Sequence, residues 1–362
     1  MPRIKYPYEF DPRKRKIAKE YRRAKFLHYF IGLFISLATA LFILFSGSNV
    51  LMRDFSLQFP LPVLVNAFLV LTVFTITGLP LSFYSSFVFD HKFKLSRYTV
   101  SGWFKDFFKG NLISYVISFI IISGLYFTTT FPQWWIYAGI LMTIFSITMN
   151  YVYPYIIIPF MWKTVPYRDK SMKDRILKLC RKIGVNEIKN IIVIKESEKS
   201  VRPNAVFMGL GSSKQIGLFD TLLKPFTRDE VETVVGHELG HYVNKDIIQG
   251  IIIDAILVFP MLFIVDYFIN SYGPMFGIHG VSDLAGLPLI GLVFGILNFV
   301  LMPLGNTYSR WRESEADKFT LMNVRKPVAQ ISTEKRLADL HLFEVEAHPL
   351  LEFWFYSHPS TM

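Results

Sequence analysis

Residues 227–246 read TRDEVETVVGHELGHYVNKD and contain the strongest structural signal in the chain. Thr227 and Glu230 have the spacing of a capping box, in which two side chains satisfy backbone N–H groups at the start of a helix. Apolar residues then recur at helical intervals: Val231, Val234, Val235, Leu239 and Tyr242. The stretch is therefore predicted to be a helix with a well-defined first residue.

Two histidines on this helix, His237 and His241, are four positions apart. Positions i and i+4 lie on one face of a helix, so both imidazoles can bind the same metal ion. Glu238 directly follows the first histidine and would lie beside that ion, where it can accept a proton from an activated water. This spacing is typical of a zinc peptidase helix. A chance match to this pattern could fall in a loop, whereas this one falls inside a helix with a well-defined start. The alternative, a pair of structural histidines on a buried helix, is less favoured.

The composition indicates a membrane protein. Of 362 residues, 52% are hydrophobic and 16% aromatic, and only 19% are charged. This is too apolar for a soluble enzyme and predicts several membrane spans. The single cysteine excludes an internal disulfide and a cysteine-based metal site. The net charge of +11 suggests nucleic-acid binding, but its distribution fits membrane topology better, so no nucleic-acid partner is expected.

Six apolar segments are each predicted to cross a bilayer. They are 26–46, 61–89, 111–131, 134–160, 247–271 and 287–304. The first 25 residues hold ten Lys and Arg against three acids, and the later connections alternate between many basic residues and few or none. Basic residues are enriched in cytoplasmic loops, so both termini and the catalytic domain are expected to face the cytoplasm.

The predicted fold class is mainly α: a polytopic α-helical membrane protein with about six spans and a cytoplasmic α+β zincin-type metallopeptidase domain. Five parts are expected: a basic N-terminal segment, four spans, the metallopeptidase domain with its metal helix, two further spans, and a C-terminal part that completes the catalytic domain. Their bounds are 1–25, 26–160, 161–246, 247–305 and 306–362.

Secondary structure within the metallopeptidase domain is expected to be mixed. A helix is predicted at 171–183 and strands at 191–195, 204–208 and 215–219. The glycine-rich stretch Gly209–Ser213 is a turn signal, so the last two strands are predicted to form a hairpin.

A third metal ligand is expected beyond the last span, because catalytic zinc is held by three protein ligands and a water. Glu313 and Asp317 lie four positions apart in SRWRESEADKF and share one helical face. Glu313 is predicted to bind the ion and Asp317 to accept a hydrogen bond from a ligand imidazole. From spacing alone, a solvated charged helix is nearly as good an interpretation.

The position of these ligands along the chain bears on the substrate. His241 comes just before the fifth span and Glu313 soon after the sixth. The site is therefore expected at, or slightly inside, the bilayer surface, with membrane proteins or lipid-attached peptides as substrates. Polar residues within spans are costly in lipid, and are expected either to line a wet cavity or to bond neighbouring helices. They include Asn150, Asp254, Asp266 and Asn298.

These motifs closely resemble one metallopeptidase family, which includes the type I CAAX prenyl endopeptidases and the bacterial protease HtpX. The resemblance runs from about Phe87 onward and rests on the motifs HELGH and RESEAD together with four longer stretches. These stretches are HKFKLSRYTVSGWFKDFFKG, PNAVFMGLGSSKQIGLFDTLL, LMPLGNTYSRWRESEADKF and HPLLEFWFYSHPS. Eukaryotic prenyl proteases are usually counted as seven-span proteins, whereas six spans are expected here.

The resemblance implies one Zn²⁺ per chain, with Glu313 as third ligand and His358 as a group that stabilises the oxyanion. An extended substrate is expected to pair with the edge strand 204–208 through main-chain hydrogen bonds, so that Asn204, Ala205 and Val206 contact it. For the side chain of Asn204, a role at a turn or strand end is an equally good interpretation. The favoured function is prenyl-protease-like removal of C-terminal residues next to a lipidated cysteine. The alternatives are HtpX-like degradation of misfolded membrane proteins and, less favoured, a catalytically silent membrane scaffold.

Overall fold

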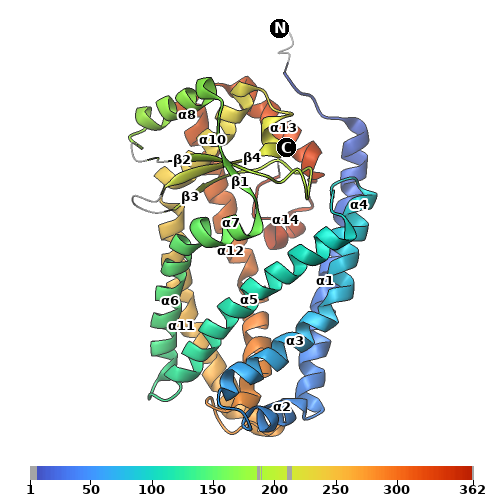
Figure 1. The fold of residues 1–362 in the computed structure, drawn as a ribbon, viewed down its shortest axis with the longest axis vertical. Coiled ribbons are helices and arrows are strands. Elements are labelled where there is room, and N and C mark those ends of the chain that lie inside the picture. The colour runs from blue at the N-terminus through green and yellow to red at the C-terminus, as the bar shows by residue number, and fades with distance from the viewer. Residues whose placement is uncertain (1–5, 186–187, 189, 210–213, 361–362) are drawn as a thin grey trace.

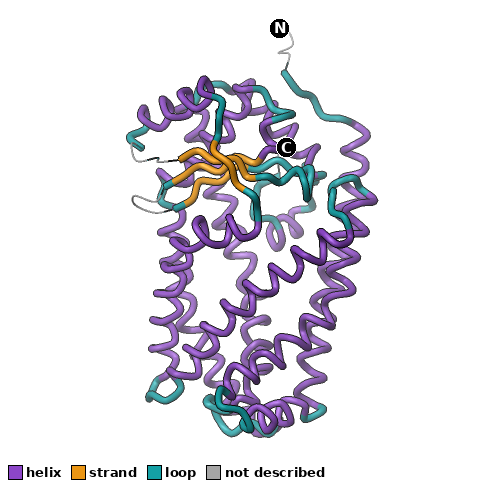
Figure 2. The backbone as a smooth tube through the Cα atoms, viewed as in Figure 1, coloured by secondary structure: helices purple, strands orange, loops and turns teal. Residues whose placement is uncertain are grey.

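The computed structural model describes residues 6–185, 188, 190–209 and 214–360. In this part of the chain, a bundle of long helices is joined at one end to a smaller α+β region that contains the sheet (Figures 1 and 2). Six helical segments in the described residues are long and apolar enough to cross a membrane. They are Pro12–Phe45, Pro62–Lys92, Val100–Thr128, Trp134–Met161, Asp246–Phe276 and Leu284–Asn323. The predicted fold class is confirmed as mainly helical with about six spans.

Within the described residues, the bundle consists of six long helices and several short ones. The long helices are α1 (Pro12–Phe45), α3 (Pro62–Phe83), α5 (Val100–Thr128), α6 (Trp134–Val152), α11 (Asp246–Tyr272) and α12 (Leu287–Asn323). The short ones are α2 (Ser48–Ser56), α4 (Asp90–Lys92) and α7 (Ile158–Met161). Two π-helical turns, η1 (Tyr84–Phe89) and η2 (Tyr153–Ile157), follow α3 and α6. Prolines 80 and 154 lie near these turns, and proline disrupts regular helical hydrogen bonding because it lacks an N–H group.

Polar residues within the spans mostly bond to the protein. The carboxylate Oδ1 of Asp266 on α11 accepts a hydrogen bond of 2.7 Å from the indole Nε1 of Trp134 on α6. The side-chain amides of Asn150 and Asn298 donate to carbonyls one turn earlier in their own helices. At Asp266, the observed contact is a hydrogen bond between two neighbouring helices, which favours that interpretation over a wet cavity.

The basic N-terminal segment forms the first turns of α1 and packs on the C-terminal part of the chain. The Arg15 guanidinium lies 2.5 Å from the carboxylate of Asp339 on α13 (Pro327–His341). The hydroxyl of Tyr8 donates to the same carboxylate at 2.7 Å. Helix α1 thus links the bundle directly to the α+β region, a contact between chain ends that no local pattern could predict.

The sheet has four strands in the described residues, β1 (Thr164–Pro166), β2 (Asn190–Ile194), β3 (Ala205–Met208) and β4 (Gln215–Phe219), in the order β1-β2-β4-β3. Strands β2 and β4 are parallel, and the other two pairs are antiparallel. The hairpin of β3 and β4 agrees with the prediction, and β3 is an edge strand as expected. Gly209 has a φ of +88°, whereas Leu210–Ser213 of the predicted turn lie outside the described residues.

Helices cover the sheet and form the core of the α+β region with it. They include α8 (Lys170–Lys182), close to the predicted range, and the short α9 (Asp220–Leu223). The buried core contains Ile176 of α8, Ile216 and Leu218 of β4, and Val235 and Leu239 of α10 (Arg228–Val243). Strand β1 was not predicted, since three residues that include a proline carry no alternating pattern.

Candidate metal centre

Helix α10 begins as the sequence predicts. The Thr227 hydroxyl accepts a hydrogen bond from the backbone N–H of Glu230 at 3.3 Å, and the Glu230 carboxylate accepts one from the N–H of Thr227 at 2.7 Å. Glu230 is fully buried and is also bonded by Ser332 and Arg336 of α13. The capping box therefore fixes the start of α10 and also ties it to α13.

The histidine helix ends before the fifth span begins. Helix α10 stops at Val243, and α11 starts at Asp246 after Lys245, whose φ is +59°. The left-handed backbone at Lys245 changes the chain direction between the two helices. The helix that carries His237 and His241 is therefore distinct from the membrane-crossing helix that follows it.

Glu313 reaches the histidines because α12 is one continuous helix and passes very close to α10. A Cβ atom added to Gly240 would lie 3.0 Å from Cα and 3.2 Å from Cβ of Ala316. Only glycine allows this approach of two backbones. The sixth span and the third-ligand segment were expected as separate parts, but both belong to α12, so the helix that crosses the membrane also carries Glu313.

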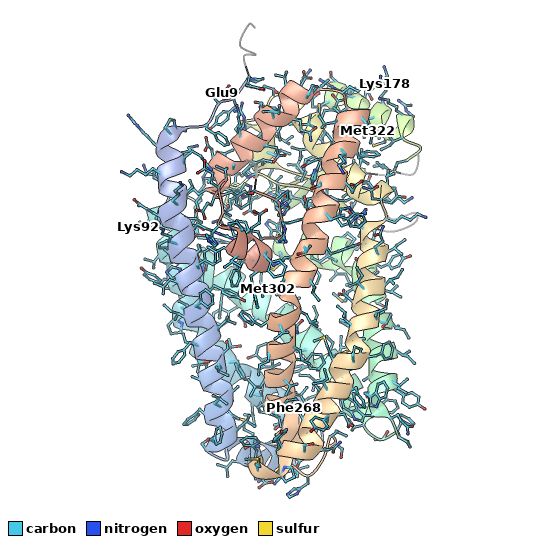
Figure 3. The ribbon with its side chains drawn as sticks, turned by 180° about the vertical axis from the view of Figure 1, so that it is seen from behind. Glu9, Lys92, Lys178, Phe268, Met302 and Met322 are labelled. Atoms are coloured by element: carbon cyan, nitrogen blue, oxygen red, sulfur yellow. The ribbon has the colours of Figure 1, made fainter. Side chains whose placement is uncertain are left out.

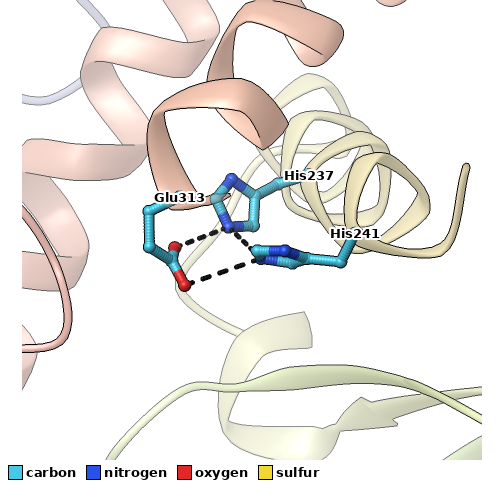
Figure 4. A group of neighbouring side chains, drawn as sticks. All are labelled: His237, His241 and Glu313. Atoms are coloured by element: carbon cyan, nitrogen blue, oxygen red, sulfur yellow. Dashed lines mark hydrogen bonds and ion pairs between the residues drawn. The ribbon is translucent and has the colours of Figure 1, made fainter. Parts of the chain in front are cut away.

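His237, His241 and Glu313 converge on one point (Figure 4). The Nε2 atoms of the two histidines are 3.0 Å apart. The Glu313 carboxylate places Oε2 at 3.1 Å from Nε2 of His237 and Oε1 at 3.7 Å from Nε2 of His241. Three electron-pair donors are therefore gathered at one place, each partly buried.

The hydrogen bonds behind the two imidazoles fit a metal site. Nδ1 of His237 lies 2.9 Å from Oδ1 of Asp317, and Nδ1 of His241 lies 2.8 Å from Oδ2 of Asp246. Since a carboxylate accepts, each Nδ1 donates and each Nε2 keeps its lone pair. Tetrahedral ligand atoms about 2.0–2.1 Å from a zinc ion lie roughly 3.3 Å apart. The observed separations are close to that value, so the residues present fit a divalent metal.

Three residues of this arrangement were not identified from the sequence. Asp246 accepts from His241 and forms an ion pair with Arg312, a buried residue of α12. Burial next to Asp317 also raises the pKa of Glu334, on α13, to about 7. Asp246 directly follows the histidine helix and could have been noticed for that reason. Nothing local in the sequence points to Arg312 or Glu334.

Replacing Asp246 with asparagine is expected to weaken metal binding by about 10–100-fold, the usual effect of losing a carboxylate that orients a ligand histidine. Asparagine can accept one hydrogen bond but carries no charge to pair with Arg312. Competition with a chromogenic chelator would measure the affinity. Asp174→Asn, at an exposed position of α8, is the matched control and should bind metal like the wild type. Equal affinity of the two variants would contradict the role given to Asp246.

Glu238 lies next to the ligands and beneath the edge strand. Its Oε2 atom is 3.4 Å from the backbone N–H of Phe207 on β3. Burial raises the pKa of Glu238, and the neighbouring His237 and His241 oppose that rise. The phenyl ring of Phe207 also packs on the ring of Tyr242, with 4.6 Å between centroids. The edge strand is thus held against the face of α10 that carries the metal ligands.

His358 reaches the site from the C-terminal end. Its Nδ1 atom lies 3.0 Å from Oε2 of Glu313. The segment before it, α14 (Pro349–Phe355), lies between α1 and α12 near the labelled Met302 (Figure 3). Arg310 of α12 holds the end of that helix by donating to the carbonyls of Glu352 and Tyr356 at 2.7 and 2.6 Å.

The other residues predicted to contact substrate lie on the same edge strand. The Asn204 side chain is exposed, and its Oδ1 accepts from the N–H of Ala205 at 2.9 Å. The N–H of Phe219 donates to the carbonyl of Asn204, which makes these two a hydrogen-bonded pair. Antiparallel pairing alternates, so the backbone groups of Val206 face β4, and those of Ala205 and Phe207 face away from the sheet.

Comparison with known proteins relates both halves of the chain to described families. Residues 166–362 match peptidase family M48. Residues 9–163 match a family described as CAAX prenyl protease N-terminal, five membrane helices. Four of the six candidate spans lie in that range, and the nine-residue α2 is too short to cross a bilayer.

Individual relatives agree with these matches. An uncharacterized metalloprotease, YhfN, of Bacillus subtilis is 28% identical over 97% of this chain and 84% of its own length. CAAX prenyl protease 1 of Saccharomyces cerevisiae is 29% identical over 79% of this chain and 67% of its own length. The crystal structure of S. mikatae Ste24p superimposes with a TM-score of 0.84 at 24% identity, covering 97% and 87% of the two chains. The last comparison shows that the fold is the same.

Proposed function

We propose, from the premise that the chain belongs to peptidase family M48 and is a membrane metalloprotease, that it is a zinc endopeptidase. In this proposal it removes C-terminal residues next to a lipidated cysteine. The observation that carries the proposal is the convergence of His237, His241 and Glu313, with Glu313 supplied by a membrane-crossing helix. The matches to CAAX prenyl protease 1 of several organisms support the same substrate class.

Zinc is the metal that this donor set favours. Two histidines and one carboxylate are a common protein ligand set in catalytic zinc sites, which leave a further position open for water or substrate. A zinc ion bound there supplies Lewis-acid chemistry, which lowers the pKa of the attacking water and polarises the scissile carbonyl. Asp317 and Asp246 hold the two imidazoles in the orientation that this binding requires.

Glu238 is proposed to accept the proton of the attacking water and then to donate it to the leaving amine. Its position next to His237 and His241, beside the edge strand, supports this role. His358 is proposed to donate a hydrogen bond to the developing oxyanion. The distance of 3.0 Å between its Nδ1 atom and Oε2 of Glu313 supports this role.

The substrate backbone is proposed to extend β3 as an additional strand. The outward-facing carbonyl groups of Ala205 and Phe207 would accept hydrogen bonds from it, because the N–H groups of these residues are already bonded to Asn204 and Glu238. Val206 would contribute its side chain. Asn204 lies at the start of this edge and can add a side-chain contact. Main-chain pairing holds a peptide without demanding particular side chains, which suits a protease that recognises its substrate by an attached lipid.

The positions of the ligands support the proposal that the substrate is attached to the membrane. Glu313 is part of α12, and α11 begins directly after α10, so the site is built at the ends of candidate spans. We place this end of the molecule in the cytoplasm because the basic residues of the N-terminal segment lie on the same side.

A cleavage assay on purified protein tests the proposal and separates it from HtpX-like degradation. The substrates are a farnesylated CAAX peptide, the same peptide without farnesyl, and an unfolded membrane protein. We expect release of the three C-terminal residues, with at least about tenfold preference for the farnesylated peptide, an effect equal to burying roughly two methylene groups. Chelation should abolish cleavage and added zinc should restore it.

Mass spectrometry of the products identifies the bond that is cut. Cleavage of the unfolded membrane protein, with the farnesylated peptide left intact, would replace the proposed function with quality control. Cleavage that survives complete metal removal would contradict the zinc mechanism itself.

A further inference from the structure

A groove separates the first two long helices, away from the metal ligands. Its volume is about 470 Å³, and its lining residues all fall within positions 25–36 of α1 and 74–85 of α3 and η1. The two helices lie side by side in Figure 1. A volume of this size is within the range of sites that hold small organic ligands, roughly 300–1,000 Å³. The peptidase mechanism uses none of the lining residues.

One end of the groove carries excess positive charge. The ammonium of Lys25 lies 2.8 Å from the carboxylate of Asp90, and the guanidinium of Arg202 lies 3.1 Å from the same carboxylate. The one negative charge of Asp90 is thus shared by two positively charged side chains, Lys25 and Arg202. Lys25 also donates to the carbonyl of Ser85 at 2.8 Å, so its charge is held at the mouth of the groove. The field at this end favours an anion.

A histidine at the same end has a free hydrogen-bonding position. Nδ1 of His28 lies 3.1 Å from the hydroxyl of Ser85. Among the residues that the structure describes, no hydrogen bond involves Nε2 of His28. The rings of Tyr84 and Phe89 pack edge-on against the imidazole and hold it in place. The Ser85 oxygen accepts from Lys25 at 3.2 Å, so the Ser85 hydroxyl proton is available for Nδ1 of His28. Nε2 then carries the ring proton and can donate it to a ligand oxygen.

Further along, the lining is mainly apolar, although it includes the hydroxyl groups of Ser36 and Thr77, and the space is kept open by glycine. Leu33, Phe74 and Leu81 contribute aliphatic and aromatic surface. A Cβ atom on Gly78 would meet nothing within 4 Å, and one on Gly32 would lie 3.4 Å from Leu81. The groove thus changes along its length from cationic to apolar, between helices that are each apolar enough to cross a membrane.

We propose that this groove binds one anionic phospholipid of the bilayer, with its phosphate beside Lys25 and His28 and an acyl chain between α1 and α3. An amphiphile with a negative head matches both ends of the groove. A prenyl group on a thioether matches only the apolar end, so the observations favour the phospholipid over a substrate tail. The inference concerns lipid binding and is independent of the proposed peptidase function.

Filling the groove tests the proposal. Gly78→Phe places a ring in the open space, and the helix tolerates it because phenylalanine has a higher helix propensity than glycine. Gly295→Phe, at an exposed position of α12 that also has nothing within 4 Å, is the matched control. Native mass spectrometry of the detergent-purified full chain, titrated with phosphatidylglycerol or phosphatidylcholine, reports the bound lipid.

The wild type and Gly295→Phe should each retain one phosphatidylglycerol in preference to phosphatidylcholine. Gly78→Phe should lower that retention at least about tenfold, since displacing just two methylene groups of an acyl chain has an effect of this size. Equal retention by Gly78→Phe and the wild type would overturn the site. Equal retention of the two lipids by the wild type would overturn the role of Lys25 and His28.

Two further measurements need no groove variant. A photoactivatable phosphatidylglycerol should cross-link to residues 25–36 or 74–85 of the wild type, and cross-links confined to other helices would contradict the proposal. A farnesylated peptide should leave the bound phospholipid in place. Stoichiometric displacement would assign the groove to the lipid of a substrate instead.

Discussion

Glu238→Gln is expected to keep its metal and to lose peptidase activity by about 10²–10⁴-fold, the usual contribution of general acid–base catalysis. Glutamine has the shape of glutamate and can still accept from the N–H of Phe207, so the position of β3 should not change. It cannot accept a proton from water. The three ligand side chains are untouched, so the metal content should match that of the wild type.

Glu315→Gln is the matched control for this prediction. Glu315 lies on α12 and pairs with Lys318 at 2.7 Å on the surface, an interaction that contributes only a few tenths of a kcal/mol. Elemental analysis and a single-turnover assay of both variants give metal content and rate separately. A Glu238→Gln protein with wild-type turnover would rule out Glu238 as the proton acceptor. Loss of the metal as well would show that the substitution disturbs the ligands instead.

Gly240→Ala is expected to disrupt the metal site by pushing α10 and α12 apart, although the substitution adds a single methyl group. Its Cβ would lie 3.0 Å from Cα and 3.2 Å from the carbonyl oxygen of Ala316, both part of the α12 backbone. A backbone cannot rotate away as a side chain can, so α10 and α12 must separate. Overpacking of this kind costs about 1–3 kcal/mol of stability.

The separation also moves His241 away from Glu313, since the two helices carry these ligands near their point of closest approach. A displacement of about 1 Å can lower catalysis by roughly 10²-fold. We therefore expect weaker metal binding, a lower Tm and at least that loss of activity. Gly250→Ala on α11 is the control, because nothing lies within 4 Å of its added Cβ. If Gly240→Ala and Gly250→Ala behave alike, the close approach does not govern the site.

Much of the architecture could be predicted because its signals are local. A span needs about twenty consecutive apolar residues, and all six such segments are found as helices. The capping box at Thr227 fixed the start of α10 correctly because it involves residues three positions apart. The strands of the β3–β4 hairpin were recognisable by composition, whereas β1 was too short and too irregular to recognise.

Features that join distant parts of the chain could not be predicted. The ion pair of Arg312 with Asp246, the contact of Arg15 with Asp339 and the groove between α1 and α3 depend on how helices pack. Asp317 was anticipated as a partner of a ligand imidazole only as one of two interpretations of a charged helix. The structure places it 2.9 Å from His237.

The sequence by itself determined that this chain crosses a membrane several times and carries two histidines and a glutamate in a metal-binding pattern, because helix periodicity and hydropathy act over short distances. Only the tertiary structure decided that Glu313 faces those histidines. That outcome depends on Gly240, which lets α12 approach α10 closely enough for a third donor to reach the other two. A metal site needs donors within a few ångströms of each other, and packing between helices sets such distances.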